Sequence, residues 1–134
     1  MTEPHNRILI IDPNHRERTV VASYLRTEDY AVDMASNLAE AVQKLAAEDF
    51  PCVILDVDLP EMKGYEAAPI LKKIRPEIKI IMTTQKNTKE LEAKVRSQSI
   101  FFYFIKSFDK DELKLAICNA FKKNKENDHG KCKE

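Results

Sequence analysis

Polar side chains suited to phosphate chemistry follow the short apolar runs of this sequence. Asp12, Asp56, the pair Thr83 and Thr84, and Lys106 each stand directly after such a run. Adjacent carboxylates repel each other unless a cation lies between them, and their hard oxygens favour Mg²⁺. A carboxylate beside Mg²⁺ can attack phosphorus, while a lysine and a hydroxyl bind the other phosphoryl oxygens. The set therefore predicts a site that forms an aspartyl phosphate.

Each of these residues also has a purely structural interpretation. An aspartate after a strand often caps a turn or a helix, and a single lysine is usually solvated. Taken one at a time, the residues favour that interpretation. Two carboxylates, a hydroxyl and an ammonium at four strand ends together favour a shared site.

Five apolar runs and five amphipathic stretches alternate along the chain. The runs typical of strands are 8–11, 30–34, 53–55, 78–82 and 101–105, and the predicted helices cover 14–28, 38–46, 67–74, 87–98 and 113–121. Strands that are apolar throughout predict a sheet covered on both faces. The alternation predicts an α/β fold, a flavodoxin-like, doubly wound, five-stranded parallel sheet in the order 2-1-3-4-5 with five helices. In this order the first and third strands are neighbours, so Asp12 and Asp56 should lie side by side.

Helix ends are marked by a few short patterns. Asn37 with Glu40, and Asp109 with Glu112, have the spacing of capping boxes. Pro69 is tolerated only near the first turn of a helix, so the third helix should start irregularly or contain a kink.

Composition narrows the class of protein. The chain has 134 residues, of which 43% are hydrophobic and 33% charged, as expected for one globular domain. Its only glycines are Gly64 and Gly130, which are too few for a dinucleotide fingerprint or a P-loop. No apolar run approaches the roughly 20 residues of a membrane span, and the first residues lack the apolar stretch of a secretion signal.

Cysteines and histidines give no sign of a metal centre. Cys52, Cys118 and Cys132 lack a C-x-x-C spacing, and the first two fall on apolar segments as buried thiols would. The histidines at 5, 15 and 129 are scattered and are interpreted as surface residues. We therefore expect a cytoplasmic protein.

The segment from Ile54 to Gly64, ILDVDLPEMKG, resembles the phosphorylation loop of receiver domains from two-component response regulators. Asp12, Thr84 and Lys106 occupy matching positions, and the resemblance covers about residues 6–122. It implies a receiver domain over 1–122, followed by a polar tail or linker over 123–134. It also explains Gly64, since a side chain there would crowd the backbone as the chain enters the third helix.

The resemblance implies a role for each matching residue. Asp56 is the phosphoacceptor, and Asp12, Asp56 and the backbone carbonyl of Asp58 are the Mg²⁺ ligands. Thr84 is the switch hydroxyl, and Lys106 pairs with the phosphoryl group. Tyr103 is the aromatic residue that moves inward when Thr84 turns toward the phosphate.

Several residues depart from the family pattern, and three of them directly follow predicted site residues. Pro13 replaces a second acid that contacts the metal, so Mg²⁺ binding should be weakened. Ser107 replaces the proline after Lys106, which predicts either a trans peptide with a shifted loop or a strained bond, because a cis bond before a non-proline residue costs about 3 kcal/mol. Gln85 replaces a small residue and should partly cover the phosphorylation site.

The resemblance implies a regulatory domain rather than an enzyme. A histidine kinase or phosphotransfer protein would phosphorylate Asp56, and the fourth helix, fifth strand and fifth helix would bind a downstream protein. Pro13, Gln85 and Ser107 motivate the alternative of a pseudo-receiver, a docking module that works without phosphorylation. Direct nucleic-acid binding is disfavoured, since no aromatic residues interleave the lysines. A homodimer is left open.

Charge is distributed unevenly along the chain, although the net charge is zero. Residues 1–67 hold 13 acidic and 6 basic residues, whereas residues 68–134 hold 9 acidic and 16 basic residues. The acidic half would attract a cation to the site. The basic half should make the face of the fourth and fifth helices more positive than the opposite one, which favours an acidic partner.

Overall fold

The computed structural model describes residues 6–98, 100–106 and 109–124, in which strands and helices alternate strictly. The elements are β1 (Arg7–Ile11), α1 (His15–Thr27), β2 (Ala31–Ala35), α2 (Leu38–Ala47), β3 (Cys52–Asp56), α3 (Gly64–Ile74), β4 (Lys79–Thr84), α4 (Lys89–Arg96), β5 (Phe102–Ile105) and α5 (Lys110–Asn124). Each overlaps a strand or helix predicted from the sequence.

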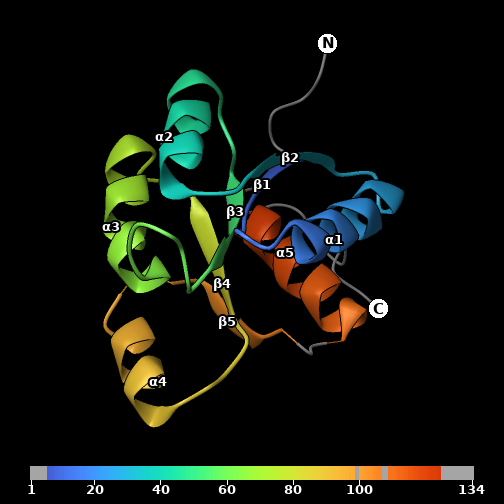
Figure 1. Cartoon of the computed structure of the whole chain (residues 1–134). Coiled ribbons are helices and arrows are strands. Elements are labelled where there is room, and N and C mark those ends of the chain that lie inside the picture. The colour runs from blue at the N-terminus through green and yellow to red at the C-terminus, as the bar shows by residue number, and fades with distance from the viewer. Residues whose placement is uncertain (1–5, 99, 107–108, 125–134) are drawn as a thin grey trace.

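The strands form one parallel sheet in the order β2-β1-β3-β4-β5, which confirms the predicted fold. β3 is central and buried along its whole length, and its Leu55 pairs with Ile11 of β1 and Met82 of β4. Helices α2, α3 and α4 lie on one side of the sheet, and α1 and α5 lie on the other (Figure 1).

Side chains of each inner strand alternate between two apolar cores. On β1, Leu9 and Ile11 belong to the core beneath α2, α3 and α4, whereas Ile8 and Ile10 belong to the core beneath α1 and α5. Burial on both faces explains why these strands are apolar throughout. The sheet is thus packed against helices on both of its faces.

The two predicted capping boxes form only in part. The Asn37 side chain accepts a hydrogen bond from the Glu40 backbone, but the Glu40 carboxylate binds the backbone and hydroxyl of Ser36 instead of returning to Asn37. Asp109 accepts a bond from the backbone N–H of Asp111 at 3.3 Å, and Glu112 reaches Asp109 through its own backbone N–H.

The third helix differs from the expectation in where it starts. It begins at Gly64, so Pro69 lies in the second turn rather than at the start. Gly64 is required there because a Cβ would lie 2.6 Å from the carbonyl oxygen of Asp56. Its N–H donates to the carbonyl of Val57 at 2.6 Å. The close approach ties the start of α3 to the residues after β3.

Some predictions concern residues that lie outside the described part of the chain. These are the peptide bond to Ser107, the tail beyond Asn124, and the residues His5, His129, Gly130 and Cys132. Of the remaining cysteines, Cys52 is buried, as predicted, and free. Cys118 was also predicted to be buried, but it is partly exposed. Among the helices described, none is long and apolar enough to cross a membrane.

Candidate functional site

The carboxyl edge of the sheet collects the predicted polar residues. Asp12 follows β1, Asp56 ends β3, Thr84 ends β4 and Lys106 follows β5. Within the described chain, the buried polar or charged residues are Asp12, Asp56, Thr83 and Thr84, all at this edge. Burial of polar groups is costly unless they are paired, so this edge is built around specific interactions.

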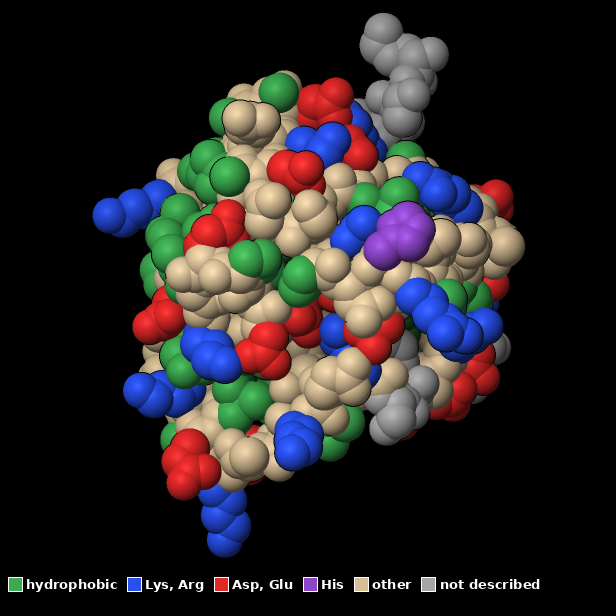
Figure 2. Space-filling model, viewed as in Figure 1, with side chains coloured by type: hydrophobic (Ala, Val, Ile, Leu, Met, Phe, Trp, Pro, Cys, Tyr) green, Lys and Arg blue, Asp and Glu red, His purple; other side chains and the backbone are tan. Residues whose placement is uncertain are grey.

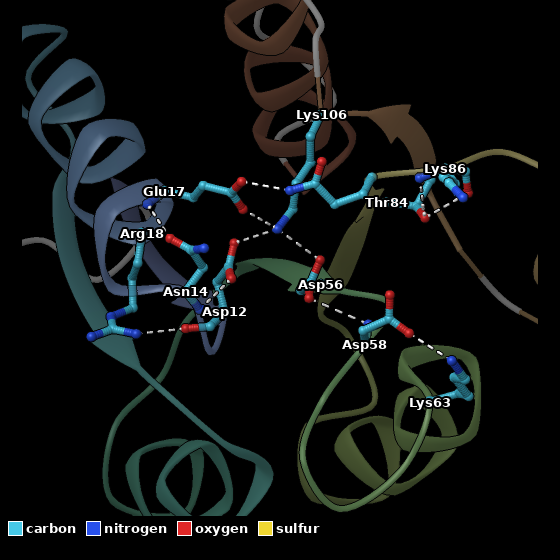
Figure 3. A network of polar contacts seen from close by, with 11 residues as sticks. Asp12, Asn14, Glu17, Arg18, Asp56, Asp58, Lys63, Thr84, Lys86 and Lys106 are labelled. Atoms are coloured by element: carbon cyan, nitrogen blue, oxygen red, sulfur yellow. Dashed lines mark hydrogen bonds and ion pairs between the residues drawn. The ribbon is translucent and has the colours of Figure 1, made fainter.

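Lys106 is the centre of the site (Figure 3). Its Nζ lies 3.0 Å from Asp12 Oδ2, 3.0 Å from Asp56 Oδ1 and 2.5 Å from Glu17 Oε1. The lysine side chain is 13% exposed, so these pairs are poorly screened by solvent. One ammonium thus joins α1, β1, β3 and β5.

Burial and charge set the proton affinities of this cluster. Burial raises the pKa of Asp56 to about 6; its hydrogen bond from Lys106 opposes the rise and the neighbouring Asp12 adds to it. Burial alone would lower the pKa of Lys106, but hydrogen bonds to Glu17, Asp56 and Asp12 raise it above its ordinary value. The lysine is therefore charged at neutral pH.

Asp12 is fixed from several directions. Its Oδ1 accepts a hydrogen bond from the backbone N–H of Asn14 at 2.9 Å, and its backbone carbonyl accepts one from Arg18 at 2.7 Å. Pro13, which lies between Asp12 and the N-cap Asn14, is exposed. The carboxylate of Asp12 is thus held in place next to Lys106.

The donors at this edge fit a hard cation in type. Asp12 and Asp56 offer carboxylate oxygens, and the N–H of Asp58 donates to Asp56 Oδ2 at 3.3 Å, which places the Asp58 backbone beside the same carboxylate. The Asp58 side chain turns away to Lys63, at 2.6 Å. In the described residues, no three or more His, Cys, Asp or Glu side chains are grouped to hold a metal ion. Backbone oxygen and water would have to complete the shell of Mg²⁺, which commonly keeps several waters.

Thr84 is not turned toward Asp56. Its hydroxyl donates to the carbonyl of Lys86 at 2.9 Å (Figure 3). Tyr103, on β5, donates its hydroxyl to Asn87 at 2.8 Å, and Asn87 donates to Glu92 of α4 at 2.5 Å. Both residues predicted to move during switching are thus engaged in the segment that leads into α4.

Two further residues reach the site from its rim. Glu17, in the first turn of α1, was not singled out from the sequence, although its spacing from the N-cap Asn14 marks it as an early helical residue. Its Oε2 accepts a hydrogen bond from Gln85 at 2.6 Å. Gln85 therefore reaches across to α1.

A cavity of about 460 Å³ opens beside the site, between α1 and α5. Its polar end includes Asp12, Glu17 and Lys106, and its walls include Val20 and Leu113. Over the face of the molecule seen in Figure 2, acidic and basic side chains are interspersed.

Comparison with known proteins points to one family. The model of the response regulator receiver domain matches residues 8–118. The transcriptional regulatory protein SrrA of Staphylococcus aureus is 31% identical over 112 residues, which cover 84% of this chain and 46% of SrrA. The chain thus spans about half the length of the curated relatives it matches.

Solved structures agree in fold. A CheY-like receiver domain protein from Methanospirillum hungatei superposes with a TM-score of 0.85 at 26% identity, covering 92% of this chain and 98% of that one. The response regulator TrrA from Thermotoga maritima, solved in complex with Mg²⁺ and BeF, gives a TM-score of 0.77 at 31% identity, with 86% and 98% covered.

Proposed function

Because this chain belongs to the family of response regulator receiver domains, we propose that it is a phosphoacceptor in a two-component system and that Asp56 takes the phosphoryl group. The donor would be a histidine kinase or a phosphotransfer protein that presents phosphohistidine. One carboxylate oxygen of Asp56 forms a bond to phosphorus while the P–N bond breaks, and the imidazole leaves with the electron pair of that bond.

The observation that supports this most is the position of Lys106 between Asp12 and Asp56. An ammonium held 3.0 Å from the nucleophile is placed to bind a phosphoryl oxygen as negative charge accumulates on that group. A docking scaffold would gain nothing from burying two carboxylates next to each other. This favours a working receiver over a pseudo-receiver.

Mg²⁺, when bound, would neutralise charge on the phosphoryl oxygens. Asp12, Asp56 and the backbone carbonyl of Asp58 would hold it. The chain itself orients the nucleophile, since Asp56 is fixed by Lys106 on one oxygen and by the N–H of Asp58 on the other.

Switching would follow from the charge added at Asp56. Thr84 would exchange its bond to the Lys86 carbonyl for one to the phosphoryl group, and Tyr103 would leave Asn87. The surface of α4, β5 and α5 would change in consequence and alter the binding of a downstream protein.

A phosphodonor assay tests the proposal. The protein is incubated with acetyl phosphate and MgCl₂, and the intact mass is measured. We expect one added phosphoryl group on the wild type, none on Asp56→Ala, and wild-type labelling on Asp33→Ala, which removes a surface acid paired with Lys44. No label on the wild type, or equal label on Asp56→Ala, would favour the pseudo-receiver.

A further inference from the structure

Glu17 is bound on both of its carboxylate oxygens. Oε1 lies 2.5 Å from the ammonium of Lys106, and Oε2 accepts from the amide of Gln85 at 2.6 Å. Asn14 caps the first turn of α1 by accepting from the backbone N–H of Glu17 at 2.9 Å. An acidic side chain at the rim is thereby directed inward, although 32% of its surface is exposed.

The Glu17 carboxylate changes the net charge of the cluster around Lys106. Asp12, Asp56 and Glu17 share the ammonium of Lys106, which leaves an excess of two negative charges around it. That excess matches the charge of one divalent cation. Without Glu17 only one negative charge would remain, and the attraction for a divalent cation would be smaller at every distance.

Glu17 can take the place of an acid that the sequence lacks directly after Asp12. The position after Asp12 holds Pro13, which has no charge and is exposed. Glu17 lies four residues further along, in the first turn of α1. Glu17 is not grouped with Asp12 and Asp56 as a direct metal ligand. It would therefore act on Mg²⁺ by electrostatic attraction and by hydrogen bonds to the waters that the ion retains.

We propose that Glu17 is a positioning residue of the cation site, in which it supplies the third negative charge in place of an acid at position 13. Gln85 holds the carboxylate at this position by binding its outer oxygen. The inference rests on the proposed function, because it assumes that the site of Asp56 takes a divalent cation.

The experiment measures the Mg²⁺ dissociation constant of each variant, by following amide signals of ¹⁵N-labelled protein without any phosphodonor. Glu17→Gln keeps the size of the side chain and removes its charge. Glu28→Gln is the matched control, since Glu28 follows the end of the same helix and pairs with Lys114 at 3.0 Å, away from the site. Pro13→Asp is combined with Glu17→Gln to return the missing charge, and Glu17→Asp retains it.

We expect Glu17→Gln to weaken Mg²⁺ binding roughly five- to tenfold, the effect of one charge on a divalent ion several ångströms away in water. Glu28→Gln and Glu17→Asp should stay within about twofold of the wild type on the same grounds. The Pro13→Asp/Glu17→Gln double variant should recover most of the loss.

An unchanged constant in Glu17→Gln would overturn the inference, as would an equal loss in Glu28→Gln or a loss that Pro13→Asp leaves unrepaired. Failure of the proposed function has a different signature: a wild type that binds Mg²⁺ but is never phosphorylated. In that case the ranking of dissociation constants still decides the role of Glu17.

Discussion

Asp56 is a carboxylate that the fold buries beside a second carboxylate, and this arrangement has a thermodynamic cost. Its pKa rises from 3.8 to about 6, chiefly through burial. The folded chain therefore binds a proton on Asp56 more tightly than the unfolded chain does. Since the native state holds more protons in this window, stability falls as the pH rises from about 4 to about 6, and the penalty persists above it.

Asp56→Asn should remove that penalty. We expect the variant to exceed the wild type in free energy of unfolding by about 1–3 kcal/mol at pH 7, since the raised pKa of Asp56 already includes the opposing effect of Lys106. The difference should shrink toward zero near pH 4. Urea unfolding at several pH values measures it, with Asp33→Asn as the surface control. A variant that is less stable than the wild type at pH 7 would contradict this account.

At the scale of elements, the junction between β3 and α3 depends on the missing side chain of Gly64. Gly64→Ala would place a Cβ against the Asp56 carbonyl, and both the carbonyl and the adjacent Val57 are backbone that cannot yield easily. We expect a loss of about 1–3 kcal/mol, as for overpacking elsewhere, and slower phosphorylation because the nucleophile is displaced. Lys73→Ala, at an exposed position of the same helix, is the control for both readouts.

A polar chain runs from β5 to α4 through the connection after β4, and in the proposed switch it would favour the unphosphorylated state. Tyr103, Asn87 and Glu92 are joined by two hydrogen bonds that link β5 to α4. Asn87→Ala should release Tyr103 and bind beryllofluoride with Mg²⁺ about two- to fivefold more tightly, since one exposed hydrogen bond no longer favours the resting state.

Ser97→Ala provides the comparison, because it removes a hydroxyl that donates to the Lys94 carbonyl at the other end of α4. Equal affinities of Asn87→Ala and the wild type for the mimic would show that this chain does not restrain the switch.

For the whole molecule, binding of Mg²⁺ should raise stability, since an ion that binds only the folded chain stabilises it by mass action. At ten times its dissociation constant, Mg²⁺ should add about 1.4 kcal/mol to the free energy of unfolding. Chelation should reverse the gain, and Asp12→Asn should abolish most of it. Thermal unfolding at constant ionic strength, with NaCl in place of MgCl₂, separates ion binding from salt screening.

The fold and the meeting of Asp12, Asp56 and Lys106 could be predicted because parallel strands bring their carboxyl ends to one edge. Glu17 could not, since its segment has weak apolar periodicity and a lone glutamate in a first turn usually serves the helix dipole. The hydrogen bond from Thr84 to the Lys86 carbonyl could not be predicted either, because the direction of a hydroxyl depends on the local backbone geometry. At Pro69 the local propensity opposes a helix, yet α3 forms because Ala67 and Leu71 on its inner face are buried.

Lys106 has a consequence for how the chain comes together during synthesis. Asp12 and its ammonium partner are separated by 94 positions, so β1 and β3 are made long before the charge that joins them. Until the fifth strand emerges, packing β1 against β3 would bury two acids with no counterion. Lys106, which follows the last strand, thus supplies the counterion of Asp12, which follows the first. This makes folding of the whole sheet cooperative and disfavours a stable, partly folded domain that lacks β5.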